Sequence, residues 1–203
     1  MKKRRHLTPQ EIMAQCKAIA REKRMAERTP WTVMNIICPY TLLKSEGYKG
    51  VRIAKILSRI EEYERMCNNG ETNLDDLEKR VCEKANGNSE SFAYTVYTEA
   101  DIKKKKGTYD YWLDSRQIGA QNIMNQEAAR YLIFFYNALI DLEGFGKKRL
   151  KRVEEKMNSL MSEYQFNRFH LSSWEKELYE EAGIEVEMPI DPLTQTQGSI
   201  MTG

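Results

Sequence analysis

Six basic side chains recur at matching positions in two stretches of the chain that lie 97 residues apart. These six are Arg52, Lys55, Arg59, Arg149, Arg152 and Lys156. Within each set the spacing is three and then four residues, which places all three side chains on one face of an α-helix. Clustered cations on a helix attract phosphate groups, so nucleic acid is one candidate ligand of this basic face.

The same spacing also has a purely structural interpretation. Apolar residues accompany the cations at helical intervals, and acidic residues follow within a turn or two: Glu61, Glu62, Glu154 and Glu155. The cations would then be the exposed flank of an amphipathic helix, partly paired with these glutamates. We favour this interpretation of the six cations over nucleic-acid binding, and both stay open on sequence grounds.

A glycine-containing turn precedes each basic helix. Gly144-Phe145-Gly146, followed by Lys147, resembles the turn of a helix-hairpin-helix, whose backbone N–H groups bind a DNA phosphate. The corresponding Gly47-Tyr48-Lys49 lacks the second glycine, and neither turn has the usual preceding proline. Gly144, Gly146 and Lys147 therefore join the six cations as a candidate surface for nucleic acid or a protein partner.

The two stretches belong to a longer internal repeat. Trp31–Asn86, here called the first segment, aligns without a gap with Ala128–Gly183, the second segment, and ten of fifty-six positions are identical. Composition alone would give about three or four identities. The match indicates a tandem duplication in preference to coincidence between two amphipathic helical stretches.

The helices that position these residues can be bounded from caps and periodicity. Thr8-Pro9-Gln10-Glu11 is a capping box that predicts a basic helix to about residue 27. Thr29-Pro30 predicts a restart, and Pro39 a bend in the helix that follows. Gly47 and Gly144 would end the first helix of each segment in a Schellman-type turn, with the aromatic side chain after each glycine packing back on it.

A second helix follows each turn, with its apolar stripe facing a core, and a third helix closes each segment. We expect the third helices to begin after caps at Asn73 and at Ser172 or Ser173. Alternating residues at 92–96 and 184–188 suggest two short strands that could pair. The tail from Asp191 is polar and unpatterned, which predicts loose or disordered chain.

The predicted fold is therefore mainly α: two tandem pseudo-symmetric three-helix modules, a basic N-terminal helix, and at most a minor β element. The expected organisation is a basic helix at 1–28, modules at 29–97 and 128–190, a lysine-rich connector leading into a long helix at 98–127, and a tail at 191–203. Modules of this size have little core of their own. We therefore expect the two modules to pack together as a dimer fused into one monomeric polypeptide, and not as a homo-oligomer.

Two further stretches leave alternatives open. The N-terminal cations at residues 2–5 and on the first helix suit a solvated helix or a nucleic-acid-contacting arm. Lys103 to Lys106 suit a soluble turn or a contact with phosphate or an acidic partner. The aromatic residues Tyr109, Tyr111 and Trp112 could stack on bases, although a core role beneath a linker is preferred.

The motif Glu-Gly-aromatic-x-x-x-Arg-(Leu or Ile) occurs in both segments, at 46–53 and 143–150. With the closing helix that ends at Gly183-Ile184, it resembles a family of small, functionally uncharacterised bacteriophage and prophage proteins that carry one such module. The resemblance implies a phage or prophage origin and a cytoplasmic, non-enzymatic accessory role. The implied partner is a phage or host protein.

Composition and motifs exclude several function classes. The chain has 203 residues, 41% of them hydrophobic and 31% charged, which is typical of a globular protein, and a net charge of +2 does not suit a strongly basic nucleic-acid coat. No apolar run approaches a membrane span or a signal peptide, so we expect a cytoplasmic protein without a membrane partner.

No catalytic, cofactor or metal site is predicted. The chain has no phosphate-binding Walker loop, no nucleophile elbow and no zinc-protease helix. His6 and His170 lie in unrelated contexts. Four cysteines show no Cys-x-x-Cys spacing and are expected to be reduced thiols: Cys16, Cys38, Cys67 and Cys82.

Overall fold

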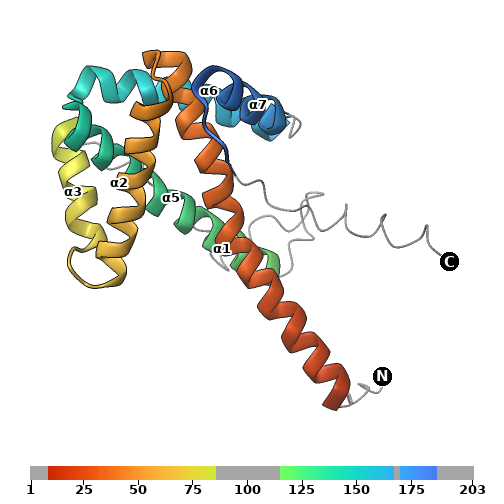
Figure 1. Ribbon diagram of the computed structural model, residues 1–203. Coiled ribbons are helices and arrows are strands. Elements are labelled where there is room, and N and C mark those ends of the chain that lie inside the picture. Colours follow the sequence, from red (N-terminus) through yellow and green to blue (C-terminus); the bar gives the residue numbers. More distant parts are fainter. Residues whose placement is uncertain (1–8, 86–114, 167–169, 187–203) are drawn as a thin grey trace, which may run out of the picture. The chain divides into compact units, whose positions relative to one another are not determined.

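The computed structural model describes residues 9–85, 115–166 and 170–186. These residues form six α-helices and no strand (Figure 1). The helices are α1 (Pro9–Glu46), α2 (Gly50–Asn68), α3 (Leu74–Ala85), α5 (Ser115–Glu143), α6 (Lys147–Phe166) and α7 (His170–Ala182). The prediction of a mainly helical protein is confirmed for this part of the chain.

Several predicted features lie partly or wholly outside the described residues. They are the cations at residues 2–5, the strand at 92–96, the lysine-rich stretch from Lys103 to Lys106 with the aromatic residues that follow it, and the tail from residue 191. The other expected strand, at 184–188, is described only to residue 186, and its described part has no regular structure.

The chain divides into two compact units, each formed by parts of the chain that are distant in sequence. One unit contains residues 1–31 and 90–130, and the other contains residues 32–89 and 131–203. In the first unit, the indole Nε1 of Trp31 donates a hydrogen bond to a carboxylate oxygen of Glu127 at 2.8 Å. The candidate site residues all belong to the second unit.

The predicted break between a basic N-terminal helix and the first helix of the repeat is wrong. α1 continues from Pro9 to Glu46 through both Pro30 and Pro39. Each proline removes one N–H bond and crowds the preceding turn, a loss of about 3 kcal/mol in a helix interior. Both prolines are buried, and the residues around Pro39 belong to the core. Packing of that apolar surface offsets the proline penalties.

The core of the second unit comes from the last part of α1, the last part of α5, and the apolar stripes of α2 and α6. Ile53, Ile56 and Ile60 are buried on α2 as their spacing predicted. On α6 the buried stripe is Leu150, Val153, Met157 and Leu160. Two further residues of the predicted stripes, Leu57 and Met161, are only partly buried.

The third helices begin differently. Asn73 caps α3 as predicted, since its side-chain oxygen accepts the N–H of Asp76 at 3.0 Å. The predicted cap at Ser172 or Ser173 is wrong, because α7 already begins at His170. Starting the helix earlier keeps Leu171 and Trp174 on one helical face, where both are buried.

Within this unit, the third helix of the first segment, α3, contacts α6 of the second segment, and α6 also contacts α7 of its own segment. At the start of α2, a methyl group added to Gly50 would lie 2.6 Å from the carbonyl oxygen of Ala182 at the end of α7. Gly50 is therefore required there by a close approach between backbones.

Candidate functional site

The turns after α1 and α5 have the same backbone conformation. Gly47 has φ of 66° and Gly144 has φ of 60°, a left-handed conformation that glycine adopts without steric cost. Tyr48 N–H bonds the carbonyl of Leu42, and Phe145 N–H bonds the carbonyl of Leu139. These carbonyls lie one residue earlier than in the predicted Schellman ending.

The two aromatic side chains that follow these glycines are buried and meet each other. The rings of Tyr48 and Phe145 are 6.4 Å apart in an edge-on arrangement. Arg52 lies over the Tyr48 ring at 4.0 Å, and Arg149 lies over the Phe145 ring at 3.7 Å. Each guanidinium is thus attracted by a ring face of its own segment.

Each of these arginines forms an ion pair with the other segment. Arg52 donates to Glu143 with Nε–Oε1 and Nη2–Oε2 distances of 2.9 and 2.5 Å. Arg149 donates to Glu46 with an Nη2–Oε2 distance of 3.0 Å. Glu46 and Glu143 are 97 residues apart, and so are the two arginines. The glutamate of each segment therefore pairs with the equivalent arginine of the other segment.

The hydroxyl of Tyr48 connects the two ion pairs. It donates to Glu143 Oε2 at 3.0 Å and accepts from Arg149 Nη2 at 2.6 Å. Arg152 adds a second guanidinium on Glu46, with Nε 2.8 Å from Oε1. We call Glu46, Tyr48, Arg52, Glu143, Phe145, Arg149 and Arg152 the central cluster.

Electrostatics in the central cluster keep Glu143 ionised and Tyr48 neutral. The hydrogen bond from Arg52 lowers the pKa of Glu143, and this outweighs the opposing effect of burial. Burial and donation to Glu143 raise the pKa of the Tyr48 phenol. At neutral pH Glu143 is therefore a carboxylate, and the Tyr48 hydroxyl keeps the proton that it donates to it.

A second group of ion pairs flanks the central cluster. The Nζ of Lys44 on α1 lies 2.7 Å from Oε2 of Glu177 and 2.9 Å from Oε1 of Glu181, both on α7. Asp141 on α5 accepts hydrogen bonds from Arg80 on α3 and from Arg59 and Tyr63 on α2, with an Arg59 Nη2–Oδ2 distance of 2.8 Å. We call these eight side chains the flanking clusters: Lys44, Arg59, Tyr63, Arg80, Asp141, Glu177, Glu181 and Tyr40, whose hydroxyl also donates to Glu177 at 2.9 Å.

Four of the six matched cations are therefore engaged with carboxylates of the chain. Arg52, Arg149 and Arg152 belong to the central cluster, and Arg59 belongs to a flanking cluster. Within the described residues the structure gives no ion pair to the other two cations, Lys55 and Lys156. Of the glutamates expected to neutralise the cations, Glu62 pairs with Arg59 at 2.6 Å.

The second turn was a candidate phosphate site because of its backbone amides. Gly144 N–H bonds the carbonyl of Ile140 at 3.2 Å, and Phe145 N–H bonds Leu139 at 3.3 Å. Two amides of the turn are thus used to end α5. Gly146 has open space around its α-carbon, and Lys147 and Lys148 just after it are exposed.

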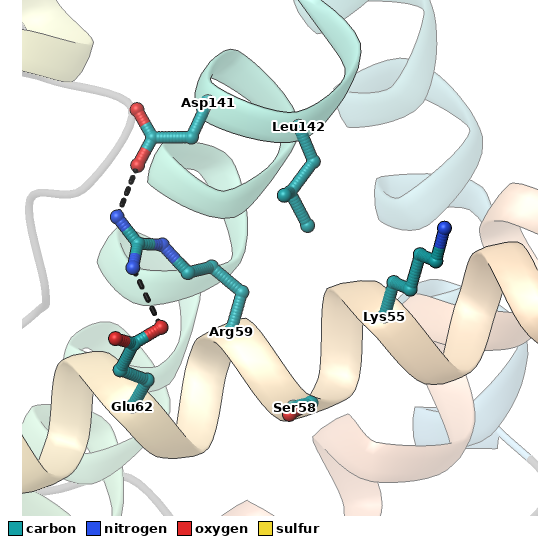
Figure 2. Close-up of a pocket in the computed structure, with 6 residues that line it drawn as sticks. All are labelled: Lys55, Ser58, Arg59, Glu62, Asp141 and Leu142. Atoms are coloured by element: carbon teal, nitrogen blue, oxygen red, sulfur yellow. Dashed lines mark hydrogen bonds and ion pairs between the residues drawn. The ribbon is translucent and has the colours of Figure 1, made fainter.

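An open pocket of about 570 Å³ lies between α2 and the end of α5. Figure 2 shows its lining: Lys55, Ser58, Arg59, Glu62, Asp141 and Leu142. The Leu142 side chain faces the α2 residues and is 45% exposed. One turn before Lys55 on α2, Val51 is 76% exposed. Apolar side chains and both signs of charge therefore share this surface.

Sequence reasoning overlooked the carboxylates of the site. Glu46 and Glu143 are identical in the repeat alignment, and that identity was the available signal for a shared role. Lys44 is aligned with Asp141, and Arg80 is aligned with Glu177, so the two members of each aligned pair have opposite charges. These charge reversals were the signal for the flanking clusters.

Other features of the described residues bear on function. No group of histidine, cysteine or acidic side chains there could hold a metal ion. Cys38, Cys67 and Cys82 are free thiols, and burial raises the pKa of Cys38 far above its ordinary value. None of the described helices has the length and apolar character needed to cross a bilayer. No known protein family, curated protein or solved structure matches the chain.

Proposed function

We propose that the chain is a tandem duplication of two three-helix modules, paired as a dimer fused into one polypeptide. It acts in the cytoplasm as a non-catalytic accessory protein of phage or prophage type, by contact with another protein. The reciprocal pairs of the central cluster support the first part, because an isologous dimer has residue i of one copy on residue j of the other and the reverse.

Packing around the third helices supports the same arrangement. Tyr40 stacks on Trp174 at 5.4 Å, and the side-chain amide of Asn137 donates to the carbonyl of Leu77 at 2.9 Å. Tyr40 and Asn137 are 97 residues apart, and so are Leu77 and Trp174. The same two positions of each segment therefore meet, through ring stacking in one case and through a hydrogen bond in the other.

The observation that supports a protein partner is that the matched arginines form ion pairs with carboxylates of the same chain. A phosphate-binding face needs unpaired cations, whereas Arg52, Arg59 and Arg149 are engaged by carboxylates. The open pocket beside Leu142 offers an apolar side chain, the amine of Lys55 and mixed charge, which suits a protein presenting an apolar and an acidic side chain.

The test is a photo-crosslinking amino acid placed at position 142 in the full chain, used in an extract of the bacterial host. Position 179 is the matched control, since Tyr179 is exposed on α7. We expect one protein captured at 142 and not at 179, and its loss when Lys55→Glu is added. Equal capture at both positions, or no effect of Lys55→Glu, contradicts the proposal.

Nucleic-acid binding remains the second candidate, favoured by one observation. Lys147, Lys148 and Lys151 are exposed on the first turns of α6. Fluorescence anisotropy with short single- and double-stranded DNA and RNA across a salt series tests it. Phosphate binding would weaken steeply with salt, by a logarithmic slope of about −0.9 per phosphate on duplex DNA.

The variant for this assay should spare the arginines of the central cluster. Changing Lys147 and Lys148 to Gln removes two exposed charges, and changing the exposed Lys79 and Lys176 to Gln is a control with the same net charge. Salt-sensitive binding lost only in the first variant would replace the protein-contact proposal by nucleic-acid binding.

A further inference from the structure

Three aligned positions at or beside the flanking clusters carry opposite charges in the two segments. Each pair is separated by 97 residues: Lys44 and Asp141, Arg80 and Glu177, and Lys84 and Glu181. In the first segment all three are cationic, and in the second all three are anionic.

Five of the six reversed side chains meet across the contact between the segments, while Lys84 is exposed. Lys44 on α1 reaches Glu177 and Glu181 on α7 at 2.7 and 2.9 Å. Asp141 on α5 accepts hydrogen bonds from Arg80 on α3. Lys44 and Asp141 are equivalent, and so are Arg80 and Glu177, so one contact occurs twice with its polarity exchanged.

The surroundings of Asp141 add a second cation of the first segment, because Arg59 also donates to it, at 2.8 Å. If two first segments met through this surface, Lys44 would face Arg80, Lys84 and Arg59. If two second segments met, Asp141 would face Glu177 and Glu181, with Lys156 at the position equivalent to Arg59. At the reversed positions, both like pairings therefore bring charges of one sign together.

We propose that the flanking clusters direct each module to pair with the other module and not with a second copy of itself. This rests on the proposed duplication. The two Glu–Arg ion pairs of the central cluster cannot make that distinction, because Glu46, Arg52, Glu143 and Arg149 would form the same pairs in any combination of modules. The flanking clusters add repulsion against the like pairings, a common source of partner specificity.

Two full-chain variants test the proposal. The mismatch variant, Lys44→Asp with Asp141→Lys, makes each module complementary to itself and repulsive to the other. The exchange variant adds Arg80→Glu, Lys84→Glu, Glu177→Arg and Glu181→Lys, so that every reversed position takes the charge of its equivalent. It also carries Arg59→Gln, so that no cation of α2 faces the new positive charge at position 141. Complementarity between the modules is then restored with the polarity inverted.

Thermal unfolding and sedimentation velocity are the measurements. We expect the mismatch variant to lose about 5 °C or more in unfolding midpoint, given roughly 2–4 °C per kcal/mol for a chain of this size. The exchange variant should recover to within about 2 °C of the wild type. Wild type and exchange variant should sediment as monomers, whereas the mismatch variant should form dimers through like modules.

Two results would overturn the proposal. An exchange variant as unstable as the mismatch variant would mean that the side chains matter for local reasons and not as complementary charges. A mismatch variant that stays entirely monomeric would mean that the charges do not choose the partner. A dimeric wild type would instead contradict the proposed fused dimer. The crosslinking test at position 142 depends on neither the mismatch nor the exchange variant.

Discussion

The central and flanking clusters join the same two segments by different rules. In the central cluster both copies use glutamate and arginine at equivalent positions, so Arg52 meets Glu143 and Arg149 meets Glu46. In the flanking clusters the equivalent positions are Lys44 and Asp141, of opposite sign. In the central cluster the charges at equivalent positions are the same in both segments, whereas in the flanking clusters they have opposite signs.

Geometry explains why only the flanking clusters tolerate inversion. Each central arginine stacks on an aromatic ring while it pairs with a carboxylate of the other segment, which requires a planar guanidinium. Inverting the signs would leave the ring without a cation above it. Lys44 lies farther from its ring, with Nζ 5.2 Å from the centroid of Tyr40, and its contacts with two glutamates require only opposite charge. Arg59 lies over the Tyr63 ring at 4.6 Å, but its position carries a cation in both segments and is not a reversed one. The central cluster thus fixes the geometry, and the flanking clusters are left to distinguish the copies.

The largest predicted effect comes from removing the aromatic side chain at the middle of the central cluster. Phe145 is 1% exposed and packs on Tyr48. Phe145→Ala should lower the free energy of unfolding by about 3–5 kcal/mol in urea titration, through lost burial and a residual cavity. Tyr179→Ala on the exposed face of α7 is the control and should change it little. Equal losses in both variants would show that the rings do not anchor the contact.

The second prediction compares the two central carboxylates. The Glu46 side chain is 5% exposed and accepts from both Arg149 and Arg152, whereas Glu143 accepts from Arg52 and Tyr48. Glu46→Gln should reduce the free energy of unfolding by about 1–3 kcal/mol, because two guanidiniums then meet an uncharged amide that has only one acceptor oxygen. Glu143→Gln should cost a similar amount if the two halves are equivalent. A loss confined to one variant would show that the reciprocity is geometric but not energetic.

Periodicity predicted the secondary structure of the repeat well because burial follows it directly. Ile53, Ile56 and Ile60 are buried at the positions that the spacing indicated, and the turns at Gly47 and Gly144 end their helices as expected. The predicted restart of α1 at Thr29-Pro30 failed because local signals cannot weigh a proline penalty against tertiary packing.

The partners of the cations could not be predicted for the same reason. Spacing along a helix places Arg52, Lys55 and Arg59 on one face but does not say what lies opposite that face. Arg52 finds its carboxylate on another segment, 91 residues away, and Arg59 finds one 82 residues away. The identity of Glu46 and Glu143 pointed to the first contact, and the reversal of charge at the position of Asp141 pointed to the second. Both signals are informative only once the segments are known to touch.

A third prediction compares how the two flanking clusters contribute to the free energy of unfolding as the pH is lowered. Burial alone would raise the pKa of Asp141, but hydrogen bonds from Arg80, Tyr63 and Arg59 outweigh it and lower the pKa to about 2. The carboxyl is more acidic in the folded chain than in the unfolded one. Its contribution to stability is therefore complete above about pH 4 and is lost as pH falls towards 2.

Urea titrations between pH 5 and pH 2 measure this loss. Asp141→Asn should flatten the dependence of the unfolding free energy on pH in that window. Hydrogen bonds from Lys44 and Tyr40 also lower the pKa of Glu177, so Glu177→Gln should flatten it too, but less, because that side chain is 39% exposed. A larger effect from Glu177→Gln would contradict the order of the two flanking pairs.

The smallest predicted effect belongs to ion pairs within a single helix. Lys176 and Glu180 lie 3.7 Å apart on α7, four residues apart and largely exposed. Glu180→Gln should change the free energy of unfolding by less than about 0.5 kcal/mol, because water already solvates both charges and the pair joins nothing distant. Urea titration beside Glu46→Gln measures the contrast directly. If the two losses were equal, the ion pairs between the segments would contribute no more than any exposed helical pair, and the aromatic centre alone would have to hold the two segments together.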